Sequence, residues 1–393
     1  MAEAWLSIIG LGEDGPKGLS PASRDALAAA ETVFGGPRHL ALADVGPRGR
    51  EWPVPFDLGP VLALRGRRVA VLASGDPFWH GAGGSLAARL APGEWRAFPA
   101  PSTFSLVAAR LGWRIENVAC LGLHAAPLAR LAPHLGPGRR AICTLRDGKA
   151  PAALAAWLVA QGDGAARLWV CEALGGPRER LRETRAATFD LTGIAAPVAV
   201  AIEATGGGLP HSAGLPDAMF AHDGTITKRP VRALTLSALA PRAGETLWDL
   251  GAGNGSVAVE WALSAPGARA VAVERRADRA ATIRRNADSF GLAHRIEVIE
   301  AELSAPLPAT PPHAVFLGGG ASAELLDRLW RTLPEGTRLV ANAVTLETEA
   351  LLIEAHAARG GHLLRVELAE AAPLGRFRGW DRARPLVQWS VQR

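Results

Sequence analysis

Short apolar runs alternate with longer amphipathic runs along most of the chain. The short runs are rich in Val, Leu and Ala, as buried strands are. The longer runs place apolar residues three or four positions apart, which is the spacing of one helix face. This alternation of strands and helices predicts an α/β fold with largely parallel sheets in both halves of the chain.

The alternation is most regular in the second half. It predicts strands at 245–250, 268–273, 295–299, 314–317 and 338–341. It predicts helices at 257–263, 277–290, 323–333 and 346–359. Two late strands, at 362–367 and 386–391, have no helix between them. We therefore expect a Rossmann-like, doubly wound sheet that ends in an antiparallel edge.

The first half opens with a strand that begins at Trp5 and enters a glycine turn. A second strand, at 68–72, runs into the motif Ser-Gly-Asp-Pro at 74–77. Each turn alone is a weak signal, because Gly, Asp and Pro are common turn formers.

The two halves join in a stretch that is rich in Gly and Pro and shows no periodicity, as linkers do. We predict a first domain at 1–205, a linker at 206–216 and a second domain at 217–393. The motifs of the two halves differ, so the chain is not an obvious duplication.

Composition places the chain among ordinary globular proteins. Of its 393 residues, 48% are apolar and 21% are charged, which allows large cores. The net charge of +5 contains no clustered basic run, so we expect no nucleic-acid partner. Biased codon usage explains the excess of Arg over Lys, and an anionic small molecule would suit the same surface.

Membrane and metal partners are not expected either. No apolar run approaches the length that spans a bilayer, and no secretory leader is recognised. The three cysteines, Cys120, Cys143 and Cys171, have neither a disulfide nor a metal spacing. We expect a cytoplasmic protein without a bound metal.

A glycine loop, Gly251-Ala252-Gly253-Asn254-Gly255, follows the strand that carries Asp249. Glycines let a ligand approach the backbone, and the next helix directs free N–H groups towards it. Glu274 ends the following strand, where a carboxylate accepts hydrogen bonds from ribose hydroxyls. The spacing GxGxG differs from the GxGxxG of nicotinamide sites and favours S-adenosyl-L-methionine. A plain strand-to-helix turn is the alternative.

Longer motifs of the second half resemble the decarboxylating precorrin methyltransferase domain of cobalamin biosynthesis. They are Phe-Ala-His-Asp-Gly-Thr-Ile-Thr-Lys-Arg-Pro from 220, Leu-Trp-Asp-Leu-Gly-Ala-Gly-Asn-Gly from 247, Phe-Leu-Gly-Gly-Gly from 316 and Pro-Leu-Val-Gln-Trp from 385. The resemblance extends from about residue 215 to the C-terminus and implies a class I methyltransferase fold.

This resemblance implies a donor site and a substrate cleft. The donor would contact Thr227, the loop Gly251 to Gly255, Glu274 and Ala301, and Asp249 would orient the loop or receive the methionine ammonium. The tetrapyrrole cleft would be bordered by Gly318, Gly319, Gly320 and Asn342. Candidates for binding substrate carboxylates are Lys228, Arg229 and Arg232, with a solvated helix face as the alternative.

The first half resembles the tetrapyrrole methylase superfamily, whose members fold as two α/β lobes. Its motifs, in family order, are Gly-Leu-Gly-Glu-Asp-Gly from 10, Ser-Gly-Asp-Pro from 74 and Pro-Ser-Thr-Phe from 101. The resemblance implies a second donor site between the lobes, at Gly10, Gly12, Ser74, Gly75, Asp76, Ser102, Thr103 and Leu145. Many members have Pro-Gly where this chain has Glu13-Asp14, so the contacts of this loop stay open.

Methyl transfer from a sulfonium to carbon needs no covalent nucleophile, so positioning can supply most of the catalysis. The resemblance implies methylation of precorrin-6B at C5 and C15 with loss of carbon dioxide from a ring acetate, giving precorrin-8x. We expect the first half to methylate C5 and the second half to methylate C15 and decarboxylate. No catalytic residue is assigned, and His211 and His222 are as reasonably structural as proton-handling.

Three rival functions remain. A nucleic-acid base methyltransferase would need Asn/Asp-Pro-Pro-Tyr/Phe after the fourth strand, where this chain has Leu317 and three glycines. A tetrapyrrole carrier would not need the donor-loop glycines, and a dehydrogenase would bind nicotinamide after Asp249. We expect a small tetrapyrrole partner and a homo-oligomer.

Overall fold

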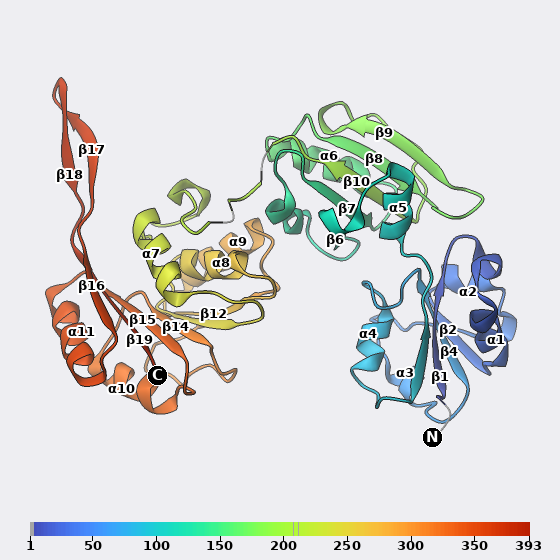
Figure 1. Cartoon of the computed structure of the whole chain (residues 1–393), viewed down its shortest axis with the longest axis horizontal. Helices are drawn as coiled ribbons and strands as arrows, with labels where there is room; N and C mark the ends of the chain where they lie inside the picture. The colour runs from blue at the N-terminus through green and yellow to red at the C-terminus, as the bar shows by residue number, and fades with distance from the viewer. Residues whose placement is uncertain (1–3, 207, 211) are drawn as a thin grey trace. The chain divides into compact units, whose positions relative to one another are not determined.

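The computed structural model describes residues 4–206, 208–210 and 212–393. Positions 207 and 211 of the expected linker, and with them the candidate His211, lie outside the described residues, as do the first three residues of the expected first domain. The chain divides into two compact units, 1–208 and 209–393, and the point of division lies within the segment expected to be a linker. Figure 1 shows the elements of both units.

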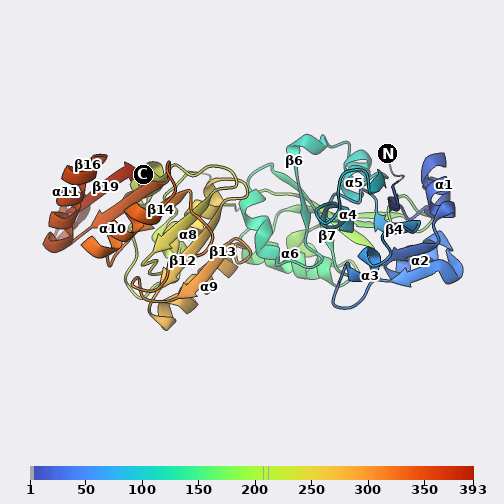
Figure 2. The same ribbon diagram turned by 90° about the horizontal axis from the view of Figure 1, so that it is seen from below.

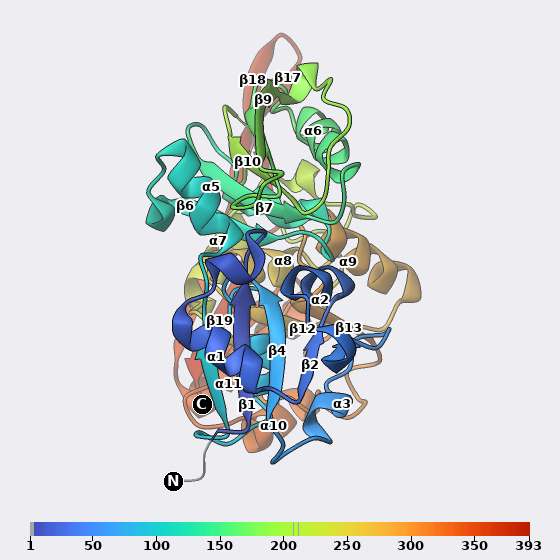
Figure 3. The ribbon, with the colours of Figure 1, turned by 90° about the vertical axis from the view of Figure 1, so that its right-hand side faces the viewer.

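The first lobe of the first unit is a parallel sheet of order β3-β2-β4-β1-β5. Its strands are β1 (Leu6–Leu11), β2 (Thr32–Gly35), β3 (Gly49–Glu51), β4 (Val69–Ser74) and β5 (Trp95–Phe98). Its helices are α1 (Pro21–Ala29), α2 (Pro37–Ala43), α3 (Gly59–Leu62) and α4 (Ala82–Ala87). Helices α1 and α2 lie on one face of the sheet (Figure 3).

Each face of this sheet packs against a core of its own. Successive side chains of a strand point to opposite faces, so both sets are buried. On β1, Leu6 joins the core that contains Val61 of α3, whereas Ile9 joins the core that contains Leu27 of α1. The strands therefore read as continuous apolar runs, and this is the pattern that the sequence shows.

The second lobe has the sheet order β6-β7-β10-β8-β9. Its elements are α5 (Thr103–Leu111), β6 (Val118–Gly122), β7 (Arg140–Leu145), α6 (Ala150–Ala160), β8 (Arg167–Glu172), β9 (Arg180–Arg185) and β10 (Val198–Glu203). Only β6 and β7 pair in parallel; β10 runs antiparallel to β7 and β8, and β9 antiparallel to β8. The expectation of a largely parallel sheet is wrong here, because the short β8–β9 connection leaves no room for a crossover helix.

The second unit is a doubly wound sheet of order β13-β12-β11-β14-β15-β19-β16. Its strands are β11 (Thr246–Leu250), β12 (Arg269–Glu274), β13 (Ile296–Glu300), β14 (Ala314–Leu317), β15 (Arg338–Ala343), β16 (His362–Val366) and β19 (Leu386–Gln392). Its helices are α7 (Arg229–Leu239), α8 (Ser256–Ser264), α9 (Ala277–Ser289), α10 (Ala323–Thr332) and α11 (Leu346–Arg359). The expected antiparallel edge is confirmed, since β19 runs antiparallel to β15 and β16.

Helices cover both faces of this sheet, with α7, α8 and α9 on one face and α10 and α11 on the other (Figure 1). Figure 2 shows β16 and α11 at one end of the unit and β13 and α9 at the other. Between β16 and β19 the chain forms an antiparallel hairpin, β17 (Ala369–Leu374) and β18 (Phe377–Arg382). The sequence did not predict this hairpin, which extends away from the sheet and leaves Trp380 74% exposed.

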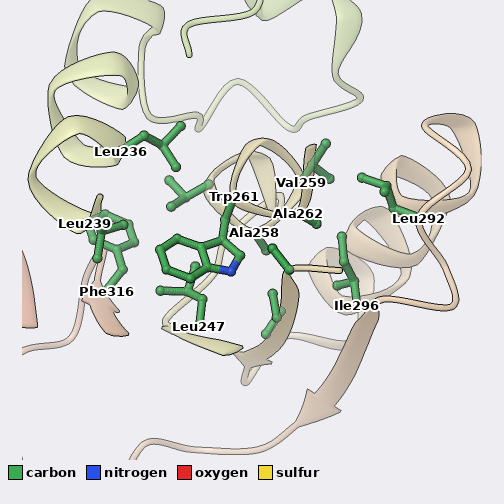
Figure 4. Packing of buried hydrophobic residues seen from close by; sticks show 14 of the residues in the cluster. Leu236, Leu239, Leu247, Ala258, Val259, Trp261, Ala262, Leu292, Ile296 and Phe316 are labelled. Carbon is green, nitrogen blue, oxygen red and sulfur yellow. The ribbon is translucent and has the colours of Figure 1, made fainter. Parts of the chain in front are cut away.

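The core beneath the glycine loop centres on Trp261 of α8, which is fully buried (Figure 4). Its neighbours in the figure include Leu247 from β11 and Leu236 and Leu239 from α7. Every residue of α8 from Ser256 to Ala262 is buried. A helix buried on all sides is fixed by packing, so the loop that leads into it has a defined position.

Residues 214–228, which we call the strap, pack against the second unit through a buried ion pair. Arg232 of α7 donates from Nε to Glu260 of α8 over 2.5 Å, and both side chains are at most 2% exposed. Glu260 also accepts the N–H groups of Gly214 (2.6 Å) and Leu215 (2.9 Å). Arg232 in turn donates to the carbonyl oxygens of Leu215 and Thr227, so one ion pair holds both ends of the strap.

Replacement of Arg232 should therefore destabilise the second unit strongly. Arg232→Ala leaves the Glu260 carboxylate buried without its cation, a change that costs about 3–5 kcal/mol. Denaturant unfolding, followed by hydrogen exchange of second-unit peptides, measures this loss. The exposed Arg242 is the matched control, and Arg242→Ala should change the free energy of unfolding by about 0.5 kcal/mol or less. Equal losses in the two variants would contradict a central role for the pair.

Candidate functional sites

A cavity of about 490 Å³ lies at the carboxyl ends of the parallel strands in the second unit. Four strands contribute to it through the residue or loop that follows each: Gly251 after β11, Glu274 ending β12, Ala301 after β13 and Gly319 after β14. The chain leaves β11 for β12 on one side and returns to β14 on the other. Ligands of doubly wound sheets bind at such a switch point.

The glycine loop at this cavity needs glycine for steric reasons. Gly251 has φ +73°, and a Cβ there would lie 2.6 Å from the carbonyl oxygen of Gly319. A Cβ at Gly255, with φ +75°, would lie 2.7 Å from Ile283 of α9. Glu274 also holds the loop, because its carboxylate accepts the N–H of Gly253 over 2.9 Å. Open space surrounds the Cα of Gly253, so a ligand can approach the loop there.

Asp249 lies beneath the loop and outside the cavity lining. It is 1% exposed, and its Oδ2 accepts the N–H of Ala258 in α8 over 3.2 Å, whereas Oδ1 has no hydrogen-bond partner. Burial, with a smaller contribution from the charge of Glu274, raises the pKa of Asp249 to about 7, although the Ala258 hydrogen bond acts to lower it. This geometry suits a role in orienting the loop and α8.

Two arginines that the sequence analysis did not single out shape the same cavity. Arg279 of α9 lines it and donates to Asp223 (2.9 Å) and Thr225 (3.2 Å) of the strap. Arg328 of α10 also lines the cavity and donates to the carbonyl oxygens of residues 303–305, of which Leu303 and Ser304 belong to the lining. In so arginine-rich a chain, no sequence signal separates these two from the rest.

The predicted site residues of the second unit do not all come together. Gly251, Glu274, Ala301, Gly319 and Gly320 line the cavity. Those outside its lining are Thr227, Lys228, Arg229, Arg232, Asp249, Ala252, Gly253, Asn254, Gly255, Gly318 and Asn342. Lys228 and Arg229 are exposed beside the strap, and Lys228 lies 3.8 Å from Asp217.

Two substrate-binding expectations need correction. Arg232 is fully buried, and its donors are used by Glu260, Asp217 and backbone carbonyl groups, so it serves the strap. Asn342 is 8% exposed and donates to Thr235 over 2.9 Å, while it accepts from Gln388 over 3.0 Å. Both side chains point inwards because α7 packs against α8, which buries Arg232, and against β15, which buries Asn342, and the sequence reveals neither contact.

Another cavity, of about 720 Å³, lies between the two lobes of the first unit. We call it the first cavity, and the cavity of the second unit the second cavity. Its first-lobe wall follows β1, β4 and β5 at their carboxyl ends and includes Gly12, Ser74, Gly75, Ser102 and Thr103. Leu145, at the end of β7, lines it from the second lobe. Aromatic side chains add flat apolar surface, with the rings of Trp79 and Phe104 5.0 Å apart.

Gly10 and Asp76 lie outside this lining. A Cβ at Gly10 of β1 would lie 1.8 Å from the carbonyl oxygen of Gly75, so glycine is needed where the loop after β4 approaches β1 closely. Asp76 accepts the N–H of Phe78 over 2.9 Å and stabilises the turn of the Ser-Gly-Asp-Pro motif.

The unusual Glu13 is the most informative residue of the first cavity. It is 8% exposed, lines the cavity, pairs with Arg38 of the first lobe and lies 3.5 Å from Arg178 of the second. Arg38 also donates to Ser74 over 2.7 Å, next to His39, whose Nε2 lies 2.8 Å from the same hydroxyl. Burial lowers the pKa of His39 to about 4, and the Arg38 charge adds to this, so the imidazole is neutral near pH 7. The departure from Pro-Gly was the only sequence signal for this polar cluster.

Neither cavity contains a cluster of metal ligands. Among the described residues, no three His, Cys, Asp or Glu side chains are arranged to hold a metal ion. Within the same residues, no helix is long and apolar enough to cross a membrane.

Comparison with known proteins assigns both units. Residues 6–190 match the family of tetrapyrrole (corrin/porphyrin) methylases, and residues 218–393 match the precorrin methyltransferase domain. A precorrin-6Y C(5,15)-methyltransferase (decarboxylating) of a Sinorhizobium species is 46% identical over 98% of this chain and 96% of its own. The protein of that description from Mycobacterium tuberculosis is 40% identical over 98% of this chain and 99% of its own.

A solved structure, the C-terminal domain of precorrin-6Y C5,15-methyltransferase from Rhodobacter capsulatus, is 55% identical. It covers 47% of this chain and 100% of its own, with a TM-score of 0.45. The two family matches make the chain a methyltransferase with two different methylase units. The chain belongs to the family of precorrin-6Y C(5,15)-methyltransferases (decarboxylating), which confirms the resemblance found in its sequence.

The buried Asp249 predicts a pH-dependent stability of the second unit. The folded chain keeps the proton of Asp249 up to about pH 7, whereas the unfolded chain releases it near about pH 4. The protonated Asp249 therefore contributes its full stabilisation below about pH 4, and this contribution to the free energy of unfolding is lost as the pH rises to about 7. Relative to Asp249→Asn, the wild type should lose up to about 4 kcal/mol across this window.

Denaturant unfolding of both proteins below and above the window measures the difference. Asp288→Asn, which changes an exposed carboxyl on α9, is the control and should parallel the wild type. Parallel curves for Asp249→Asn and wild type would show that the carboxyl is already ionised when folded.

The Glu13 cluster predicts that Glu13 contributes more to the stability of the first unit than Arg178 does. Glu13→Gln removes charge-assisted hydrogen bonds from a buried site and should lower the free energy of unfolding of the first unit by about 1.5–3 kcal/mol. Arg178 is 63% exposed, so Arg178→Gln should change it by about 1 kcal/mol or less. Hydrogen exchange of first-unit peptides in denaturant measures both values. A loss for Arg178→Gln as large as that for Glu13→Gln would mean that the contact between lobes dominates.

Proposed function

We propose that this chain transfers methyl groups from S-adenosyl-L-methionine to C5 and C15 of precorrin-6B and removes carbon dioxide from a ring acetate, giving precorrin-8x. The observation that carries the proposal is the presence of two separate cavities, one in each unit and each at the carboxyl ends of parallel strands. Each unit also contains one of the two family matches. Full-length relatives at 46% and 40% identity carry the name of this reaction.

We assign C5 methylation to a first domain at 1–205, and C15 methylation with decarboxylation to a second domain at 217–393, joined by a linker at 206–216. This division is supported by the separate family matches, because the precorrin methyltransferase match lies wholly in the second unit. A second relative group, the probable cobalt-precorrin-6B C(15)-methyltransferases (decarboxylating), aligns with only 34% of this chain, as expected for one domain.

The chain's residues fit a methyl donor in both cavities. In the second unit, Glu274 at the end of β12 and Gly251 of the glycine loop line a volume of about 490 Å³. A Cβ at Gly253 of the same loop would meet no atom within 4 Å, so the loop is open to a ligand there as well. The donor residues proposed there are Thr227, Asp249 (through the loop), Gly251, Ala252, Gly253, Asn254, Gly255, Glu274 and Ala301. Those proposed in the first unit are Gly12, Ser74, Gly75, Ser102, Thr103 and Leu145, with Gly10 and Asp76 shaping the loops.

When bound, S-adenosyl-L-methionine supplies an electrophilic methyl group on a positively charged sulfur. The electron pair of an enamine-like macrocycle carbon forms the new carbon–carbon bond as the sulfur–methyl bond breaks, and the proton on that carbon then leaves. The protein has to hold the macrocycle carbon in line with the sulfur–methyl bond and exclude water, so most of the catalysis is positioning. As carbon dioxide leaves the ring acetate, the conjugated macrocycle accepts the electron pair of the broken carbon–carbon bond. A proton then adds to the side-chain carbon to leave a methyl group, and the protein orients the acetate.

The substrate is an anionic tetrapyrrole, for which the second unit offers Gly319 and Gly320 in the cavity lining, the adjacent Gly318, and the exposed cations of Lys228 and Arg229. The planar aromatic wall of the first cavity suits the same macrocycle. We propose a cytoplasmic homo-oligomer without nucleic-acid or membrane partners. The free thiols of Cys120, Cys143 and Cys171 support a reducing compartment.

The test is product analysis by mass spectrometry after incubation of the full chain with precorrin-6B and S-adenosyl-L-methionine. The expected product carries two added methyl groups and has lost one carbon dioxide. Thr103→Trp fills the first cavity and should abolish C5 methylation alone, whereas Gly319→Trp fills the second and should abolish C15 methylation and decarboxylation alone. Gly319 suits this purpose, because it lines the cavity and a Cβ there would meet no atom within 4 Å.

Either single variant serves as the folding control for the other, since each keeps one reaction. Unchanged precorrin-6B after incubation with a folded wild-type chain that binds the donor would overturn the assignment. Loss of both reactions in each variant would overturn the division of labour between the two domains.

A further inference from the structure

One face of α9 holds both the glycine loop and the strap of the second unit. Arg279, Ile283 and Asn286 lie four and three residues apart, so they form one stripe along the helix. Arg279 binds Asp223 and Thr225 of the strap, and Ile283 packs against Gly255 of the loop. Asn286 contacts both segments at once.

The amide of Asn286 makes three hydrogen bonds, all to backbone groups. Its Oδ1 accepts the N–H of Ala221 in the strap over 2.9 Å, and its Nδ2 donates to the carbonyl oxygen of the same residue over 3.0 Å. The same Nδ2 donates to the carbonyl oxygen of Asn254 in the glycine loop over 2.8 Å. The Asn254 side chain completes the junction by donating to Ala221 over 3.3 Å.

The chemistry of this junction selects asparagine. Two carbonyl oxygens need a donor and one N–H needs an acceptor within a few ångströms, and a carboxamide offers both. Asn286 is 1% exposed, so an unmet backbone group there would have no water as substitute. Asp has the same shape but lacks the N–H donors, and Leu lacks both.

We propose that Asn286 is a positioning residue for methyl transfer in the second unit. It fixes the strap, which carries Thr227, at a set distance from the glycine loop, so that the two segments form one donor-binding surface. Asn286 lies outside the cavity lining, so it acts through Ala221 and Asn254. The proposal deepens the proposed function and rests on it for the identity of the donor.

The test uses Asn286→Asp in the full chain, with precorrin-6B and S-adenosyl-L-methionine as substrates. The donor KM for C15 methylation should rise about tenfold or more, because two donated hydrogen bonds are lost from the loop-to-strap junction. The kcat at saturating donor should change by about twofold or less, since bound donor restores the surface. The donor KM for C5 methylation, measured in the same molecule, should not change.

Thr337→Val is the matched control. Thr337 is 2% exposed and donates to the carbonyl oxygen of Pro312 over 3.4 Å, just before the start of β15 and so at the opposite end of the strands from the cavity. Thr337→Val loses a buried hydrogen bond as Asn286→Asp does, but it should leave the donor KM unchanged for both C5 and C15 methylation. Hydrogen exchange should quicken in strap peptides of Asn286→Asp and not in those of Thr337→Val.

An unchanged donor KM for C15 methylation in Asn286→Asp, or strap exchange at the wild-type rate, would overturn the positioning role. A fall in kcat with an unchanged donor KM would also overturn it. If the wild type yields no methylated precorrin, the proposed function fails instead. Equilibrium binding of S-adenosyl-L-methionine to the full chain then decides the role of Asn286: the variant should weaken one of two sites, and two unaffected sites would overturn the proposal.

Discussion

The Arg232–Glu260 ion pair is the interaction on which the second site depends. It is buried between α7 and α8, and its remaining hydrogen-bonding capacity is used by the backbone at both ends of the strap. A buried charge pair is tolerated only where such extra hydrogen bonds satisfy it. The pair therefore fixes both ends of residues 214–228, and Asn286 and Arg279 of α9 hold the middle of the segment.

The two units place a cavity by the same physical rule with different parts. In both, parallel strands end at one edge of a sheet, and glycine-containing loops leave space for a ligand there. The second unit lines this edge with Glu274 and a loop that packs on α9. The first unit brings a second lobe against the edge, and Glu13 contacts arginines from both lobes. A nearly buried carboxylate at a glycine loop is common to the two sites, although Glu274 accepts a loop N–H and Glu13 pairs with arginines.

Periodicity was a good guide wherever each strand is followed by its own helix. The strands and helices expected between 245 and 359 appear within about two residues of their predicted bounds, because local apolar spacing determines which face of each element is buried. It failed where the pairing of strands, and not the apolar spacing within each strand, decides the structure. The antiparallel pairing of β10 with β7 and β8, and the β17–β18 hairpin, depend on which strands meet, and short apolar runs look alike in either case.

The sequence by itself determined the family, the fold class and the loops that form the cavities, because glycine and acidic positions at strand ends carry their steric and hydrogen-bonding roles in their identity. Only the tertiary structure decided which polar side chains face a ligand. Arg232 and Asn342 were expected at the substrate and are buried in internal contacts, whereas Glu13, Arg279 and Asn286 hold the sites together. The physical reason is that a polar residue on a helix or strand reads the same in sequence whether it points to solvent, to a cavity or to a buried partner. The packing of α7, α9 and the two lobes makes that choice.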